Sequence, residues 1–81
     1  MNDLILQHVA DCAGKVADDY WLAPVRATND RLYGLIRQCA ENDSAWQAAR
    51  DLLLSFNMGN DPQDALRAFA SKLRKIAEGE K

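Results

Sequence analysis

The sequence has few of the residues that build catalytic, metal-binding or membrane-spanning proteins. Its 81 residues include one histidine, two cysteines, two prolines and four glycines, and aromatic residues make up 7%. The longest uninterrupted apolar run is Tyr20–Ala23, far shorter than the roughly 20 residues of a membrane span. Two cysteines do not make a disulfide scaffold, and no charged segment followed by an apolar run opens the chain as a signal peptide would. We therefore expect a cytoplasmic protein with reduced thiols and no membrane partner.

Patterns for catalysis and metal binding are missing as well. There is no glycine-rich phosphate loop and no serine on a strand-to-helix turn. His8 lies one helical turn before Cys12, but a structural zinc site needs four ligands and only Cys39 could add another. In a hairpin of the first two predicted helices, Cys39 lies roughly 9 Å along the axis from the level of Cys12. We expect no enzyme activity, no metal, no cofactor and no Cys12–Cys39 disulfide.

The composition is that of a folded globular protein. Hydrophobic residues make up 48% of the chain and charged residues 27%, which excludes a disordered chain. The length fits one domain over residues 1–81. A net charge of −2 and a pI near 5.2 are too balanced to indicate a nucleic acid or an anionic membrane as the partner.

A helical hairpin in the second half of the chain is the clearest structural signal. Apolar residues spaced by 3, 4 and 3 positions lie on one face of a helix, and two such series occur: Trp46, Ala49, Leu53 and Phe56, then Leu66, Phe69, Leu73 and Ile76. Between them, Gly59 can take the left-handed conformation that ends a helix. Asp61 can cap the next helix, with Pro62 at its first position. Two helices joined by so short a turn lie antiparallel or sharply crossed.

Two further helices are predicted before this hairpin. Their apolar series are Ile5, Val9, Cys12, Val16 and Tyr20, then Leu22, Val25, Asn29, Leu32, Ile36 and Cys39. Pro24 separates the two helices, because the residue before a proline avoids the helical region. Ser44 and Gln47 form the S-x-x-Q pattern of a capping box at the start of the third helix. The predicted fold is all-α, a compact bundle of four short helices over about 3–20, 24–40, 45–57 and 62–77.

The third predicted helix is apolar around most of its circumference. The consecutive residues Leu52, Leu53 and Leu54 cover about 200° of it, more than three neighbouring helices in a small domain can bury. We expect Leu53 to face the core, and Leu52 or Leu54 to face another chain. Large apolar and aromatic residues often anchor interfaces, and the candidates for partner binding are Trp21, Trp46, Leu52 and Leu54.

These features predict a small non-catalytic module for protein–protein interaction. The partner would be another protein or a second copy of the chain. Small helical proteins without catalytic groups are often regulators or inhibitors, and phages and other mobile elements encode many that act on host protein machines. This step is an association by size and style alone, with no motif behind it.

Two alternatives stay open. The predicted hairpin also fits a helix-turn-helix unit that binds nucleic acid, whose candidate contacts are Arg67, Lys72, Arg74 and Lys75. Acidic Asp61 and Asp64 at the start of its second helix oppose that function, because they would face phosphates. Separately, Asp43-Ser44-Ala45 resembles, over three positions, the Asp-Ser-Leu motif of acyl carrier proteins. That resemblance implies a prosthetic group on Ser44, but the motif's leucine is Ala45 here and its upstream glycine is missing.

Overall fold

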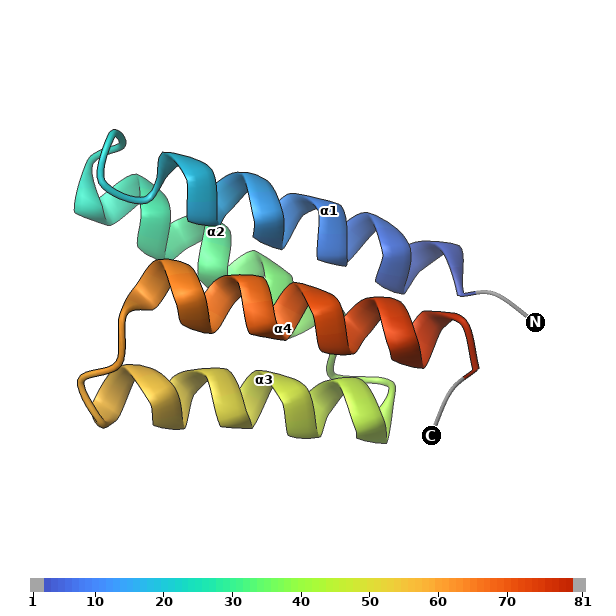
Figure 1. Cartoon of the computed structure of the whole chain (residues 1–81). Helices are drawn as coiled ribbons and strands as arrows, with labels where there is room; N and C mark the ends of the chain where they lie inside the picture. Colours follow the sequence, from blue (N-terminus) through green and yellow to red (C-terminus); the bar gives the residue numbers. More distant parts are fainter. Residues whose placement is uncertain (1–2, 80–81) are drawn as a thin grey trace.

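The computed structural model describes residues 3–79 and confirms the predicted all-α fold. The helices are α1 (Leu4–Asp19), α2 (Val25–Gln38), α3 (Asp43–Asn57) and α4 (Pro62–Ala77) (Figure 1). Their ends agree with the predicted ends to within a few residues. Nothing in the described range is strand, and none of its helices is both long and apolar enough to cross a membrane.

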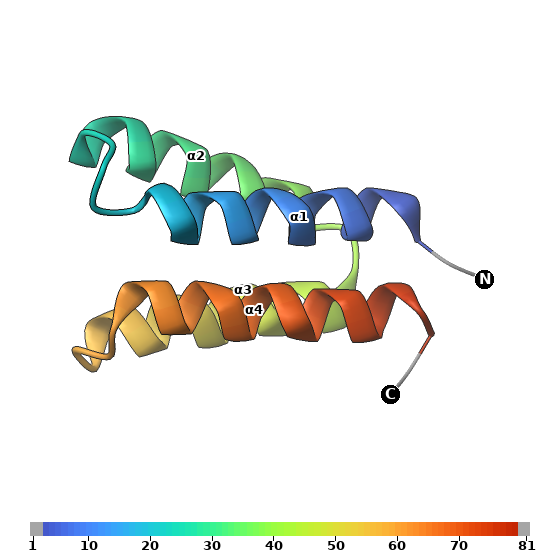
Figure 2. The same cartoon turned by 45° about the horizontal axis from the view of Figure 1, so that its top comes forward.

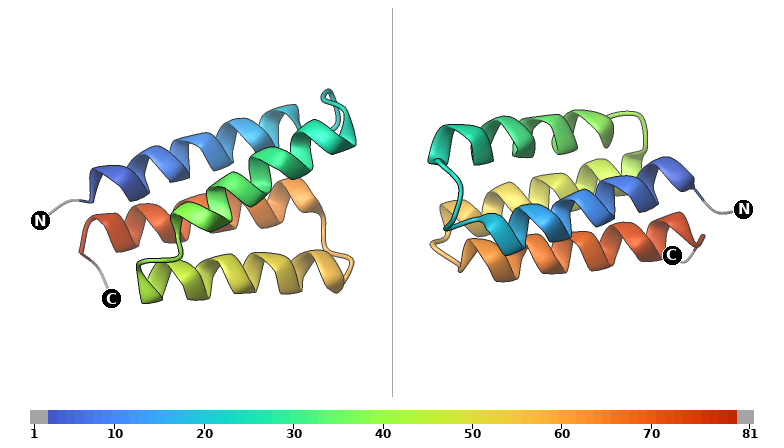
Figure 3. Two further views of the ribbon diagram at one scale, coloured as in Figure 1. Left: turned by 180° about the vertical axis from the view of Figure 1, so that it is seen from behind. Right: turned by 90° about the horizontal axis from the view of Figure 1, so that it is seen from above.

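Helices α1 and α4 form the centre of the molecule. They lie side by side and antiparallel and share the most extensive helix–helix interface, whereas α2 packs mainly on α1 and α3 on α4 (Figures 1 and 2). The backbone N–H of Asp3 donates to the carbonyl of Ala77 over 2.9 Å, which ties the start of α1 to the end of α4. The domain measures 36 × 22 × 18 Å. From behind, α2 crosses the central pair obliquely (Figure 3).

The core between the central helices combines a few large side chains with many alanines. The largest fully buried side chains are Phe69, Leu6, Leu66, Leu73, Val9, Val16 and Cys39. Buried alanines on α1 and α4 are Ala10, Ala13, Ala17, Ala70 and Ala77. Alanine has no side chain beyond Cβ and is the best helix former, so α1 and α4 can pack closely without voids.

The turn between α3 and α4 has the predicted construction. Gly59 has a φ of +81°, the left-handed region that glycine adopts without a steric cost. The N–H of Gly59 donates to the carbonyl of Phe56, and the N–H of Asn60 to that of Ser55, each over 3.1 Å. These two bonds form a Schellman motif, which satisfies the last carbonyls of α3. The Asp61 carboxylate then caps α4 by accepting from the N–H of Gln63 over 2.9 Å.

The predicted N-cap of α3 was wrong. The helix begins at Asp43, and the capping residue is Asn42, whose side-chain oxygen accepts from the N–H of Ala45 over 3.0 Å. Asn42 has the extended backbone of a capping residue, with φ −120° and ψ 116°. Asparagine caps helices as well as serine does. Asn42 comes before Ser44 in the chain, so α3 begins after the earlier of these two possible caps. Ser44 therefore lies inside the first turn.

The predicted inner faces of α1 and α2 were shifted by about one residue in places. Ile5 is exposed, and Leu6 is buried in its stead. Leu22 lies in the connection before α2, and both it and Val25, the first residue of α2, are exposed. The residues that α2 buries are Thr28, Leu32, Leu35 and, just past its end, Cys39. This series and the predicted one share Leu32 and Cys39 and have nearly the same helical spacing, so periodicity alone could not separate them.

Candidate protein-interaction surface

One side of α3 carries three large apolar side chains that the bundle covers only in part. Trp46, Leu53 and Leu54 are 40%, 42% and 56% exposed. They are spaced by seven and one positions, so they lie on one side of the helix, and we call them the α3 stripe. The opposite side of α3 is held in the core by buried residues, which are Ala45, Ala48, Ala49 and Leu52.

This orientation of α3 corrects two predictions. Leu53 was expected in the core and is partly exposed, whereas Leu52 was a candidate for partner binding and is only 3% exposed. The reason is that α3 turns its alanines inward, which lets it approach the bundle closely, and Leu52 shares that face. Trp46 and Leu54 are exposed, as a partner-binding role requires.

The fourth candidate, Trp21, lies on a different part of the molecule. It is exposed in the connection between α1 and α2, together with Leu22 and, at the start of α2, Val25. The Tyr20 and Trp21 rings pack edge to face, with centroids 4.9 Å apart. This connection lies at the opposite end of the bundle from the start of α3 (Figure 1). Trp46 belongs to the first turns of α3, so the structure does not bring the two tryptophans together.

A hollow of about 160 Å³ adjoins this connection. It is lined by Tyr20, Trp21, Ala23, Val25, Thr28 and Asn29. Thr28 is almost fully buried, and its hydroxyl has no hydrogen-bond partner among the described residues. Trp21 therefore belongs to a second apolar surface, separate from the α3 stripe.

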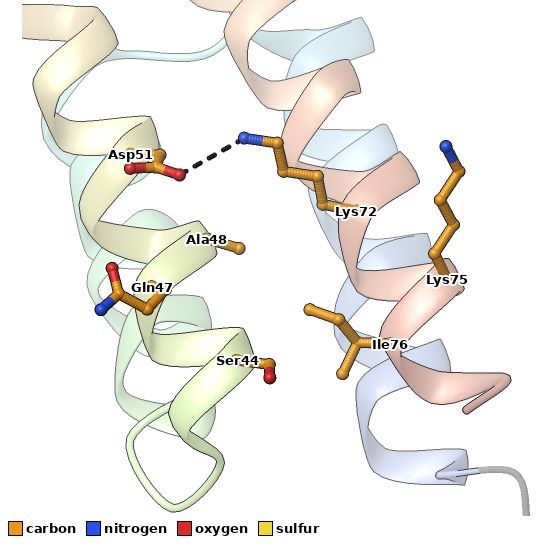
Figure 4. A pocket seen from close by; sticks show the side chains of 7 residues that line it. All are labelled: Ser44, Gln47, Ala48, Asp51, Lys72, Lys75 and Ile76. Atoms are coloured by element: carbon orange, nitrogen blue, oxygen red, sulfur yellow. Dashed lines mark hydrogen bonds and ion pairs between the residues drawn. The ribbon is translucent and has the colours of Figure 1, made fainter. Parts of the chain in front are cut away.

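A groove runs along the outer surface between α3 and α4. Its main hollow, of about 280 Å³, is lined by Ser44, Gln47, Ala48, Asp51, Lys72, Lys75 and Ile76 (Figure 4). The ammonium of Lys72 lies 3.4 Å from the Asp51 carboxylate and spans the groove. A smaller hollow of about 40 Å³ shares Ala48, Asp51 and Lys72 and continues toward Ser55 and Ala65. Residue spacing did not predict this groove, because it depends on how α3 and α4 are placed against each other.

Most of the basic residues of α4 face carboxylates of this same chain. The Arg67 guanidinium lies 3.3 Å from Asp18, and that of Arg74 lies 3.3 Å from Asp11. Lys72 pairs with Asp51 across the groove, and Lys75 has no carboxylate of residues 3–79 within 4.0 Å. Moreover, α3 and α4 run antiparallel side by side (Figure 1), whereas the two helices of a helix-turn-helix unit cross at about 90–120°.

The cysteines and the histidine form no site with three ligands. Both thiols are free, and His8 Nε2 lies 3.5 Å from Cys12 Sγ one turn away on α1. No cluster of three or more His, Cys, Asp or Glu residues in the described part of the chain could hold a metal ion. Burial raises the pKa of the Cys39 thiol to about 11, so this thiol stays protonated and unreactive at neutral pH.

Comparisons of the chain with models of protein families, with curated protein sequences and with solved structures gave no match. A function must therefore be inferred from the chemistry of the surface itself. Three features of that surface stand out, namely the α3 stripe, the aromatic connection between α1 and α2, and the groove between α3 and α4.

Proposed function

We propose that the protein is a non-catalytic helical module that binds another protein through the α3 stripe. The observation that carries the proposal is the exposure of Trp46, Leu53 and Leu54 on one side of a helix whose other side is fixed in the core. Burying such side chains against a partner is favourable by about 25 cal/mol per Å² of apolar surface. Because the bundle already holds the helix in place, little conformational entropy opposes docking.

A protein partner suits this surface better than a nucleic acid does. Nucleic-acid binding depends on cations that neutralise phosphates, and three of the four candidate cations are paired with carboxylates of the chain itself. Tryptophan is enriched where protein interfaces are anchored. The partner that we propose is another protein or a second copy of this chain.

The small size and the lack of a catalytic constellation support a further step in the same proposal. A module of this kind acts by occupying a surface of its partner, as regulators and inhibitors do. We propose a role of this class, including the regulators of host protein machines that phages and other mobile elements encode. This step rests on the small size and helical architecture of the molecule, and no sequence motif supports it.

The α3 stripe is tested with a charge placed in it. Leu54→Glu should weaken self-association, measured by analytical ultracentrifugation, or capture of a partner from the source cells, measured by affinity purification with mass spectrometry. Ala27→Glu on α2 is the matched control, since it adds the same charge at another exposed helical position. Circular dichroism should show both variants folded. If Leu54→Glu leaves both kinds of binding as strong as Ala27→Glu does, the α3 stripe is not the interface.

A further inference from the structure

We propose that the groove between α3 and α4 binds a short acidic helix of a partner protein. Aliphatic side chains of that helix would fill the groove, and its carboxylates would reach Lys72 and Lys75. The inference rests on the proposed function, because it takes the chain to be a protein-binding module. It concerns a different surface, however, since the groove and the α3 stripe lie on different sides of α3.

The dimensions of the groove suit a docked helix. Its two hollows share Ala48, Asp51 and Lys72 and extend along α3 from Ser44 to Ser55. Eleven residues of helix correspond to about 16 Å, or three turns. In the main hollow, Ala48 and Ile76 face each other from the two helices (Figure 4). Its volume of about 280 Å³ exceeds the roughly 150 Å³ of a cavity that takes up benzene, so aliphatic side chains fit.

The walls of the groove favour a helix over an extended segment. Both walls are α-helices, whose backbone N–H and C=O groups are already bonded within each helix. The groove therefore offers side chains but no backbone partners. An extended peptide would lose the hydrogen bonds that its backbone makes to water, whereas a helix satisfies its own backbone and can present a row of apolar anchors.

The charges of the groove select an acidic occupant. Lys72 and Lys75 line the groove from α4, and Asp51 is the one acidic residue that lines either hollow, so the lining carries a net positive charge. The Lys72–Asp51 pair is more than half exposed on both sides, and pairs of this kind are weak. Lys72 can therefore turn to a partner carboxylate at little cost, and Lys75 is available to a second one. Such complementarity sets partner choice and the association rate.

The experiment uses two synthetic peptide helices and the whole protein. Both peptides carry Leu at alternating third and fourth positions, and one has Glu where the other has Lys on the flanks of the Leu row. Binding is followed by the backbone amide signals of the isotope-labelled protein in two-dimensional NMR. We expect the Glu peptide to shift signals of Ser44–Ser55 and Ala65–Ile76 and the Lys peptide to bind at least about tenfold more weakly.

Charge variants make the test specific to the groove. Lys75→Glu should weaken binding of the Glu peptide about tenfold and strengthen binding of the Lys peptide. Lys15→Glu on α1 is the matched control, because it makes the same charge change at another exposed helical lysine, and it should leave both affinities nearly unchanged. Equal losses of affinity for the Glu peptide in the two variants would mean that only the net charge of the protein matters, and would overturn the proposal. Shifts confined to the α3 stripe or to the connection between α1 and α2 would overturn it as well.

The two proposals can fail separately. Leu54→Glu, which disrupts the α3 stripe, should leave binding of the Glu peptide in the groove intact. If the Glu peptide binds the groove and no protein partner is lost with Leu54→Glu, the groove proposal is supported and the α3-stripe proposal is rejected. If a partner is lost with Leu54→Glu and neither peptide binds the groove, the α3-stripe proposal is supported and the groove proposal is rejected.

Discussion

At the scale of single residues, Cys39 links burial to pH-dependent stability. Its side chain is fully buried, and the absence of water raises its pKa from 9.0 to about 11. In the unfolded chain the thiol ionises near pH 9, whereas in the folded protein it holds its proton to about pH 11. Between these values the folded state binds more protons, so stability is fully present below pH 9 and falls as the pH rises.

We expect this thiol to cost up to about 2–3 kcal/mol of folding free energy between pH 9 and 11, because each pKa unit corresponds to about 1.4 kcal/mol. The measurement is urea unfolding as a function of pH. Cys39→Ala is the control, since it removes the thiol and leaves every other ionisable group in place. A variant that loses as much stability as the wild type over this pH range would contradict the assignment.

Capping residues give a second prediction at this scale. Asn42→Ala should lower the free energy of unfolding by about 1 kcal/mol, because the N–H of Ala45 loses its acceptor. Asp61→Ala should cost a similar amount through the N–H of Gln63. Ser44→Ala should change stability by only a few tenths of a kcal/mol, because alanine is the better residue inside a helix. Thermal or urea unfolding of the three variants checks this. A large loss of stability in Ser44→Ala would indicate that Ser44 caps α3.

At the scale of elements, the three consecutive leucines of α3 differ in burial, with Leu52 in the core and Leu53 and Leu54 in the α3 stripe. Leu52→Ala should destabilise the fold by about 2–5 kcal/mol, as truncation of a buried leucine does. Leu54→Ala should cost less than about 0.5 kcal/mol, because the side chain is mostly in water. Leu53→Ala should lie between the two. Unfolding in urea ranks the variants, and a ranking with Leu53 as the most sensitive position would mean that α3 is rotated from its place in this structure.

The same leucines show what the sequence could predict and where it failed. Local signals were sufficient for the turn between α3 and α4, because Gly59, Asp61 and Pro62 act within a few residues of their own positions. The facing side of α3 was not predictable from periodicity, since apolar residues surround the helix. What decides it is the close fit of Ala45 and Ala48, and that advantage exists only once a neighbouring helix is in place.

The candidate surfaces were likewise predictable only where a single helix determines them. The excess of apolar residues on α3 predicted that Leu52 or Leu54 would be exposed, and Leu54 is. Trp46 was grouped by spacing with Leu53 on the side that packs against the next helix, and its exposure was not predicted. The groove was not predicted either, because it depends on which faces of α3 and α4 meet in the predicted hairpin. The ion pair of Asp51 with Lys72 and the facing of Ala48 and Ile76 depend on the placement of α3 against α4. No spacing along one helix encodes that placement.

At the scale of the whole molecule, stability is distributed unevenly among the helices. Six residues of α1 and five of α4 are buried, and these two helices share the largest interface. Helix α2 buries three residues and packs extensively on α1 alone. One of the three is Thr28, whose hydroxyl has no hydrogen-bond partner among residues 3–79, and this weakens the contribution of its burial. We therefore expect α2 to unfold locally while α1 and α4 remain folded.

Native-state hydrogen exchange measures this directly. Amides in the middle of α2, such as that of Leu32, should exchange through a partial opening with a lower free energy than global unfolding. Amides at Val9 of α1 and Phe69 of α4 should exchange only through global unfolding, because their helices are each other's main support. Thr28→Val would remove the unpartnered hydroxyl while keeping the shape of the side chain, and should slow exchange in α2 more than in α4. Equal exchange free energies at Leu32, Val9 and Phe69 would mean that the four helices unfold as one cooperative unit.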